Sequence, residues 1–125
     1  MLIVDDQAPF RHAAAAVVAL SPGFSSAAEV ESGEAAVEAA SRLRPDLLLM
    51  DINLPGINGI ETTRRVLAAL PETTVLLLST YPLDELPADA RTCGAAGYVN
   101  KESFDPASLA EAWEHRGSGF WAAVG

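Results

Sequence analysis

Residues 46–59 read DLLLMDINLPGING, and this stretch predicts both a buried strand and a functional loop. The apolar run Leu47–Met50 favours a strand covered on both faces, as in a parallel sheet. Asp51 follows the run directly, and the Pro and Gly residues beyond it indicate a loop. Ligands of parallel α/β sheets bind outside the carboxyl ends of the strands, so Asp51 is a candidate site residue.

A second acidic pair, Asp5 and Asp6, follows the apolar run Leu2–Val4 in the same way. If the two strands are parallel and adjacent, three carboxylates meet at one sheet edge, and their repulsion favours a bound cation. Mg²⁺ binds through one or two carboxylates and keeps positions for water and phosphate oxygens. The sequence therefore predicts a Mg²⁺ site made by Asp6, Asp51 and the backbone carbonyl oxygen of Asn53.

Apolar runs alternate with helical patterns along the chain, an order typical of a βα unit repeated five times. Strands are expected at 2–4, 24–30, 47–50, 75–79 and 96–99. Helices are expected at 9–20, at 34–43 after a Ser32 cap, at 60–70, from an Asp84 cap through Cys93, and from an Asp105 cap to about His115. The predicted fold is a doubly wound α/β domain with a five-stranded parallel sheet. We expect one domain over 1–116 and a C-terminal tail over 117–125.

Composition narrows the function classes. With 125 residues, 50% of them apolar, the chain can form one domain with a sizeable core. Eight basic residues, without a long run, and a net charge of −9 argue against direct nucleic-acid binding. The apolar runs are too short for a membrane span, and no signal peptide is expected. The single cysteine, Cys93, fits a reducing, cytoplasmic location.

Ser79 ends one expected strand and Lys101 lies just beyond another, which places both at the same sheet edge as the carboxylates. Asp51 can attack phosphorus and form an acyl phosphate, a step that depends mostly on positioning and charge neutralisation. Lys101 offers an ammonium group, and Ser79 offers a hydroxyl donor, to the oxygens of a phosphoryl group. The residues themselves therefore indicate phosphoryl transfer to Asp51.

Four motifs occur in order: Val4-Asp5-Asp6, residues 51–59, Leu78-Ser79-Thr80 and Gly97-Tyr98-Val99-Asn100-Lys101. With these motifs the chain resembles bacterial response-regulator receiver domains over Met1 to Arg116. The resemblance implies a flavodoxin-like (βα)5 fold with strand order 2-1-3-4-5, and phosphorylation of Asp51 by a sensor histidine kinase. It implies a site in which Asp6, Asp51 and Asn53 hold Mg²⁺, Asp5 is a further acidic member, and Lys101 and Ser79 contact the phosphoryl group.

In the family that the chain resembles, phosphorylation moves a hydroxyl residue and an aromatic residue, which correspond here to Ser79 and Tyr98. The implied signalling face is the fourth helix, fifth strand and fifth helix, and a homodimer through this face is one expectation. Residues 51–56 and 97–102 are most similar to the LuxR/NarL-type branch, so an output DNA-binding domain in a longer chain is another expected partner. The resemblance implies a phospho-acceptor switch and not an enzyme, with at most self-catalysed phosphorylation and slow autodephosphorylation.

The chain departs from the family pattern at three places, and two of them, Thr80 and the altered fourth helix, support an alternative, a pseudo-receiver that binds proteins without phosphate. Glu102 stands where many receivers have a proline after a cis bond, Thr80 replaces a smaller residue, and Pro82 and Pro87 shorten the fourth helix. An aspartyl phosphatase of the haloacid dehalogenase type is a further alternative, but that family needs a second Asp where Asn53 stands.

Simpler interpretations stay open for single residues. Asp5 and Asp6 can cap the first helix, Lys101 can be a solvated surface lysine, and Tyr98 can be an ordinary half-buried strand aromatic. The Ser79 hydroxyl can be satisfied by backbone alone. The aromatic residues near the C-terminus are expected to pack on the last helix: Trp113, Phe120 and Trp121.

Overall fold

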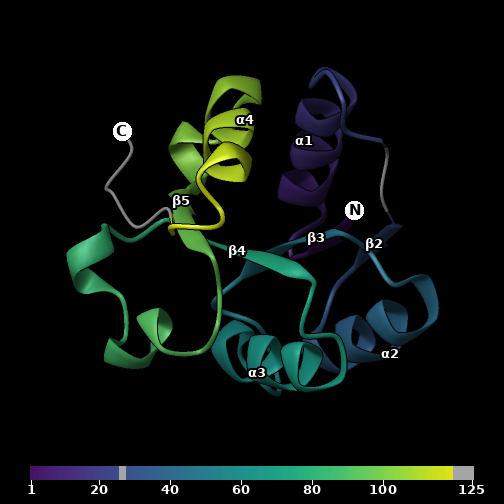
Figure 1. Cartoon of the computed structure of the whole chain (residues 1–125), viewed down its shortest axis with the longest axis vertical. Coiled ribbons are helices and arrows are strands. Elements are labelled where there is room, and N and C mark those ends of the chain that lie inside the picture. The colour runs from purple at the N-terminus through teal and green to yellow at the C-terminus, as the bar shows by residue number, and fades with distance from the viewer. Residues whose placement is uncertain (26–27, 120–125) are drawn as a thin grey trace.

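The computed structural model describes residues 1–25 and 28–119, and these form one five-stranded parallel sheet with helices on both faces (Figure 1). The strand order is β2-β1-β3-β4-β5. The strands are β1 (Leu2–Val4), β2 (Ala28–Val30), β3 (Leu47–Asp51), β4 (Thr74–Ser79) and β5 (Gly97–Asn100). The α-helices are α1 (Ala8–Ala19), α2 (Gly33–Leu43), α3 (Gly59–Ala69) and α4 (Pro106–Glu114). The predicted α/β fold and strand order are confirmed.

Both faces of the sheet are apolar because a layer of helices covers each one. α1 and α4 lie on one face, and α2 and α3 lie on the other (Figure 1). Successive residues of a strand point to opposite faces. In β3, Leu48 and Met50 therefore join the core with α2 and α3, whereas Leu47 and Leu49 join the core with α1 and α4. This division explains why the sequence shows unbroken apolar runs instead of alternating residues.

Side-chain caps determine where the helices begin. Ser32 Oγ accepts a hydrogen bond from the Ala35 N–H at 3.1 Å, so the predicted cap of α2 is confirmed. Asp105 Oδ1 accepts from the Ser108 N–H at 2.8 Å, and Ser108 Oγ accepts from the Asp105 N–H at 2.9 Å. This reciprocal capping box starts α4 where the sequence predicts it.

The helix predicted over 84–93 is wrong. The chain between β4 and β5, here called the β4–β5 segment (residues 80–96), instead forms two short 3₁₀ helices, η1 (Leu83–Glu85) and η2 (Ala88–Arg91). Pro87 separates them because it has no N–H to donate and disfavours helical geometry at the residue before it. Leu86 accordingly has extended angles, φ −71° and ψ 152°. The expected signalling face is therefore made of the β4–β5 segment, β5 and α4.

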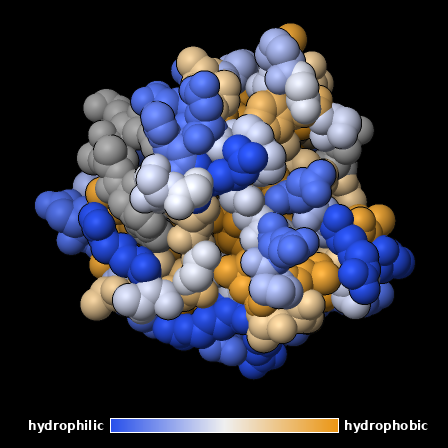
Figure 2. Space-filling view, in the orientation of Figure 1, coloured by the Kyte–Doolittle hydropathy of each residue, from blue (hydrophilic) through white to orange (hydrophobic). Residues whose placement is uncertain are grey.

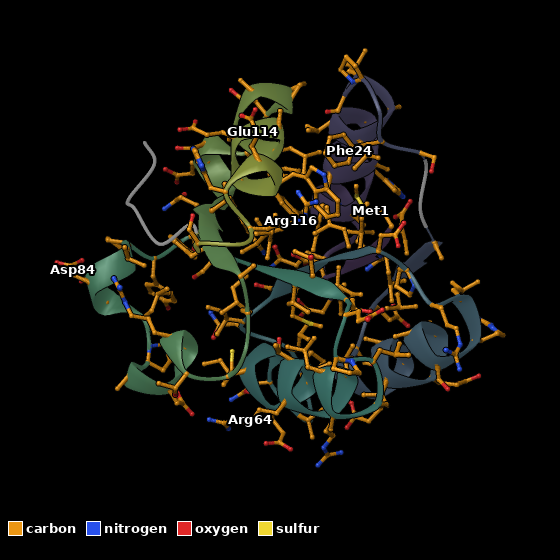
Figure 3. The ribbon with its side chains drawn as sticks, viewed as in Figure 1. Met1, Phe24, Arg64, Asp84, Glu114 and Arg116 are labelled. Carbon is orange, nitrogen blue, oxygen red and sulfur yellow. The ribbon has the colours of Figure 1, made fainter. Side chains whose placement is uncertain are left out.

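A few side chains fasten the β4–β5 segment. Arg64 Nη2 on α3 lies 3.1 Å from Asp89 Oδ2, and Cys93 Sγ donates to the Ala90 carbonyl oxygen at 3.2 Å. Cys93 is buried, and burial raises the pKa of its thiol. Asp84 lies inside η1, points away from the sheet (Figure 3), and caps no helix. The segment thus depends on side-chain contacts more than on a continuous helical ladder.

The second strand is shorter than predicted. Among the described residues β2 spans Ala28–Val30, and the predicted strand residues 26–27 lie outside the described part. Phe24 is not in the strand and packs edge-to-face against Trp113, with 6.0 Å between the ring centroids. The expectation that Trp113 packs the last helix is confirmed. The same expectation for Phe120 and Trp121 lies outside the described residues.

The surface seen in Figure 2 is mostly hydrophilic, with hydrophobic side chains in small patches between polar ones. Among the described residues, three large hydrophobic side chains are well exposed: Leu20, Leu43 and Tyr81. No helix in the described part of the chain combines the length and the apolar character needed to cross a membrane.

Candidate functional site

Three carboxylates converge at the carboxyl-terminal edge of β1 and β3. The two strands are adjacent and parallel, with Val4 beside Met50, so the residues that follow, Asp5 and Asp51, meet at one edge. Oxygen atoms of Asp5, Asp6 and Asp51 all lie within 4.8 Å of one another. Asp5 and Asp51 are buried, whereas Asp6 is exposed. The predicted convergence of the acidic side chains is confirmed.

Lys101 brings a positive charge to the two buried carboxylates. Its Nζ lies 2.6 Å from Asp5 Oδ2 and 3.3 Å from Asp51 Oδ1, and its side chain is only 11% exposed. β5 ends at Asn100, whose side-chain oxygen accepts a backbone hydrogen bond at 2.9 Å and caps the 3₁₀ helix η3 (Lys101–Ser103). The interpretation of Lys101 as a solvated surface lysine is wrong.

The loop after Asp51 must return close to the strand that it leaves. The Gly59 N–H donates to the Ile52 carbonyl oxygen at 2.8 Å. A Cβ at Gly59 would overlap the Asp51 carbonyl oxygen and lie 2.8 Å from the Ile52 Cα. At Gly56 the chain turns with φ 73°, a conformation that favours glycine. These two glycines allow α3 to begin against the backbone of the candidate phospho-acceptor.

The carboxylates carry more negative charge than their donors neutralise. Burial is the main cause that raises the pKa of Asp51 to about 6, and the charge of Asp5 adds to the rise. The Lys101 ammonium and the Asn53 backbone N–H act in the opposite direction. Asp5 Oδ1 accepts from the Gln7 N–H at 2.8 Å, but its buried Oδ2 has the ion pair with Lys101 and no well-formed hydrogen bond among the described residues. Such an oxygen set fits a hard divalent cation.

Ser79 and Tyr98 are linked at the ends of β4 and β5. Ser79 Oγ accepts from the Tyr81 N–H at 3.1 Å, so its hydroxyl proton is free for another acceptor. Tyr98 is 1% exposed, and its hydroxyl lies within hydrogen-bonding distance of two carbonyl oxygens, that of Ser79 at 3.2 Å and that of Tyr81. Burial raises the pKa of the Tyr98 phenol. Tyr98 is therefore a fully buried link to the β4–β5 segment, and the interpretation as a half-buried strand aromatic is wrong.

A groove of about 460 Å³ opens beside this edge of the sheet. It is lined by residues from the loop after β3, the end of β4 and the β4–β5 segment: Ile52, Asn53, Ser79, Tyr81, Glu85, Leu86 and Pro87. Asn53 is exposed at its rim, and Thr80, which departs from the family pattern, is exposed but does not line the groove. The ligand role of the Asn53 carbonyl oxygen stays a prediction.

One neighbour of the site was missed from the sequence. The Lys101 ammonium lies over the ring of Phe10, 4.6 Å from its centroid. Phe10 is the third residue of α1 and packs against Phe104, with 6.4 Å between the centroids. No local pattern distinguishes Phe10 from an ordinary core residue. Its position, four residues after Asp6 in a helix that starts at the functional edge, is the signal that could have indicated it.

Comparison with known proteins identifies the family of this chain. Residues 1–114 match the response regulator receiver domain family. The chain is 38% identical over 112 residues to the transcriptional regulatory protein DegU of Brevibacillus brevis, which covers 90% of this chain and 47% of that protein. It is 29% identical to the nitrate/nitrite response regulator protein NarL of Escherichia coli, over 95% of this chain and 55% of NarL.

Solved structures show the same fold. A LuxR-family two-component response regulator from Aurantimonas superposes with a TM-score of 0.84 at 30% identity, covering 95% of this chain and 86% of the other. The signal receiver domain of NarL from Mycobacterium tuberculosis gives 0.77 at 30% identity, covering 90% and 94%. The chain spans about half the length of the curated relatives it matches, such as DegU. The match over residues 1–114, together with the carboxylates and lysine at the sheet edge, shows that this chain belongs to the response regulator receiver domain family.

Proposed function

We propose that this domain is a phosphorylation-dependent switch that accepts a phosphoryl group from a sensor histidine kinase on Asp51. The observation that carries the proposal is the placement of Asp51, buried next to Asp5 and 3.3 Å from the Lys101 ammonium. A carboxylate in this position is held for attack and has a counter-charge beside it.

In the proposed reaction an Asp51 carboxylate oxygen attacks the phosphorus of the phosphohistidine. The oxygen–phosphorus bond forms while the nitrogen–phosphorus bond breaks, and the electron pair of that bond stays on the imidazole nitrogen. Lys101, now paired with Asp5 and Asp51, balances the added negative charge. The Ser79 hydroxyl can donate its proton to a phosphoryl oxygen.

We further propose that Asp6, Asp51 and the Asn53 carbonyl oxygen hold Mg²⁺, with Asp5 as a neighbouring acidic group. The fit rests on the three carboxylates, whose oxygen atoms lie within 4.8 Å of one another and carry more negative charge than the Lys101 ammonium offsets. When bound, Mg²⁺ supplies charge neutralisation between the carboxylates and the incoming phosphoryl oxygens.

The switch is proposed to run from Ser79 to Tyr98. When the Ser79 hydroxyl moves toward the phosphoryl group, it loses its contact with the Tyr81 N–H and gains one with a phosphoryl oxygen. The Tyr98 hydroxyl is bonded to the carbonyl oxygens of Ser79 and Tyr81, so the movement displaces its partners. The result is a shift in the conformational equilibrium of the β4–β5 segment. We propose that the acyl phosphate hydrolyses slowly within the domain, as the family resemblance implies, and that the domain is a switch and not a turnover enzyme.

DegU and NarL are named a transcriptional regulatory protein and a response regulator, respectively. By analogy we propose that one face of the domain controls either an output domain of the DNA-binding kind or a second receiver. This face consists of the β4–β5 segment, β5 and α4.

Incubation with acetyl phosphate and Mg²⁺, followed by intact-mass measurement, tests the proposed function. We expect the mass of one phosphoryl group to be added to the wild-type chain and to Asp46→Asn, but not to Asp51→Asn. Asp46 is the matched control because it is exposed and precedes the same strand at its opposite end. A wild-type chain that stays unlabelled while folded would favour the pseudo-receiver alternative.

A further inference from the structure

The Lys101 ammonium is enclosed by three groups from separate parts of the chain. Asp5 Oδ2 lies 2.6 Å and Asp51 Oδ1 3.3 Å from Nζ, and the Phe10 ring faces it with the centroid at 4.6 Å. The lysine side chain is only 11% exposed, so water cannot surround the charge freely. The electron-rich face of an aromatic ring attracts a cation in this position, and does so more strongly when the cation is desolvated.

The first turn of α1 holds Phe10 in a defined place relative to the carboxylates. The Gln7 N–H donates to Asp5 Oδ1 at 2.8 Å, and the Phe10 N–H donates to the Gln7 carbonyl oxygen at 3.1 Å. Arg11 Nη1 donates to the Asp5 carbonyl oxygen at 2.8 Å. Side chains on a helix lean toward its N-terminus, which here is the functional edge of the sheet.

A second aromatic residue, Phe104, packs against the Phe10 ring and follows the short helix in which Lys101 lies. Phe104 ends η3, the 3₁₀ helix that Lys101 opens, and its ring packs against Phe10 at an interplanar angle of 47°. Phe10 therefore contacts both the ammonium and the end of the turn that carries it. This is more than filling the core under α1 requires.

We propose that Phe10 is a positioning residue for phosphorylation, because its ring face holds the Lys101 ammonium toward Asp5 and Asp51. The inference rests on the proposed function of Asp51 as phospho-acceptor and assigns a role to a residue outside the acidic site. Without the ring, the long lysine side chain gains conformations that turn it away to solvent. The ammonium is then present less often where the phosphoryl group must bind.

Two variants, Phe10→Leu and Phe10→Tyr, distinguish an effect of the aromatic ring face from an effect of filling the space. Phe10→Leu keeps an apolar side chain but removes the ring, and Phe10→Tyr keeps the ring. Phe24→Leu is the matched control, because Phe24 is a partly buried aromatic of the same core and contacts Trp113 of α4 (Figure 3). Phe24 lies beside Met1 and Leu47, at the start of β1 and β3, whereas Lys101 lies beyond the end of β5.

The first measurement is the initial rate of phosphorylation by acetyl phosphate at saturating Mg²⁺, taken over a range of donor concentrations. We expect Phe10→Leu to lower the maximal rate by roughly three- to tenfold, with Phe10→Tyr within about twofold of wild type. Phe24→Leu should leave the rate unchanged. Equal rates for Phe10→Leu and Phe24→Leu, or no rescue by tyrosine, would overturn the proposal.

The second measurement does not depend on phosphorylation, so it separates failure of this inference from failure of the proposed function. The ring face shifts the Lys101 ε-methylene proton resonances upfield, and we expect Phe10→Leu to remove this shift while Phe10→Tyr and Phe24→Leu keep it. If Phe10→Leu fails to fold, a fluorinated phenylalanine at position 10 keeps the shape and weakens the ring face. An unchanged phosphorylation rate in that protein, or the absence of an upfield shift of the Lys101 ε-methylene resonances in wild type, would contradict the assignment.

Discussion

Lys101 Nζ lies 2.6 Å from Asp5 Oδ2, closer than to the residue that we propose is phosphorylated. Because the lysine charge is shared in this way, it offsets the burial of Asp51 only in part. The pKa of Asp51 accordingly remains raised, from 3.8 to about 6. The stability of the metal-free domain should therefore depend on pH through this carboxyl group in the acidic range.

Asp51→Asn should be more stable than wild type near neutral pH when no divalent cation is present. In wild type, the folded chain binds the Asp51 proton more tightly than the unfolded chain does. The stability that this proton contributes to the wild-type fold is complete below about pH 4 and is lost as the pH rises through about 6. The free energy of unfolding of wild type relative to Asp51→Asn should fall by up to about 3 kcal/mol across that window. Urea unfolding of both proteins at several pH values, with chelator, measures it. A difference independent of pH would contradict the raised pKa.

Asp6→Asn should weaken Mg²⁺ binding by roughly tenfold or more, because a hydrated Mg²⁺ site has few protein ligands to lose. We expect millimolar-range affinity in wild type. The rise in melting temperature with Mg²⁺ concentration reports the affinity, since a ligand that binds only the folded state stabilises it. Asp84→Asn removes an equal charge from an exposed 3₁₀ helix and should keep the wild-type response. Equal Mg²⁺ stabilisation of the two variants would exclude Asp6 as a ligand.

Gly59→Ala should destabilise the domain by roughly 1–3 kcal/mol, because the added Cβ meets the backbone of Asp51 and Ile52. The strain falls on the strand end that carries Asp51, so the phosphorylation rate should fall as well. Gly117→Ala is the control, since a Cβ there has no atom within 4 Å. Chemical unfolding and acetyl phosphate labelling of the two variants check this. Similar free energies of unfolding for both variants would show that the loop accommodates a Cβ at position 59 and would contradict the close approach.

Tyr98→Phe should loosen the β4–β5 segment while leaving the sheet intact. The substitution keeps the buried ring but removes the hydroxyl that lies beside the Ser79 and Tyr81 carbonyl oxygens. We expect a loss of about 1 kcal/mol in stability, and faster amide exchange in residues 81–93 than in β1 or β3. Hydrogen exchange read by mass spectrometry detects this. Tyr81→Phe, at a side chain that is 52% exposed, should show neither effect. Unchanged exchange in Tyr98→Phe would remove the link from Tyr98 to the segment.

Much of the fold could be predicted because local signals and the final packing agree. Leu47–Met50 is apolar throughout since both faces of β3 are covered, and Ser32 and Asp105 each cap the helix that follows. The convergence of Asp5 and Asp51 follows from strand adjacency, which the alternating pattern implies.

The remaining features depend on contacts that are distant in sequence. In the β4–β5 segment, the residue pattern favours a helix, but the extended conformation of Leu86 before Pro87 prevents it. Phe10 becomes a neighbour of Lys101 only when α1 and the end of β5 meet, 91 positions apart in the chain numbering. Single-residue propensities contain no information about such a meeting.

Because the β4–β5 segment forms two 3₁₀ helices instead of one regular helix, a conformational change in it would differ from the movement of a helix. A helix moves as a rigid rod because each turn is bonded to the next, whereas 3₁₀ helices of three and four residues have few internal bonds to break. Rearrangement between β4 and β5 therefore needs fewer hydrogen bonds to break than the movement of a whole helix does. A binding partner would then recognise a newly shaped loop and not the displaced face of a cylinder.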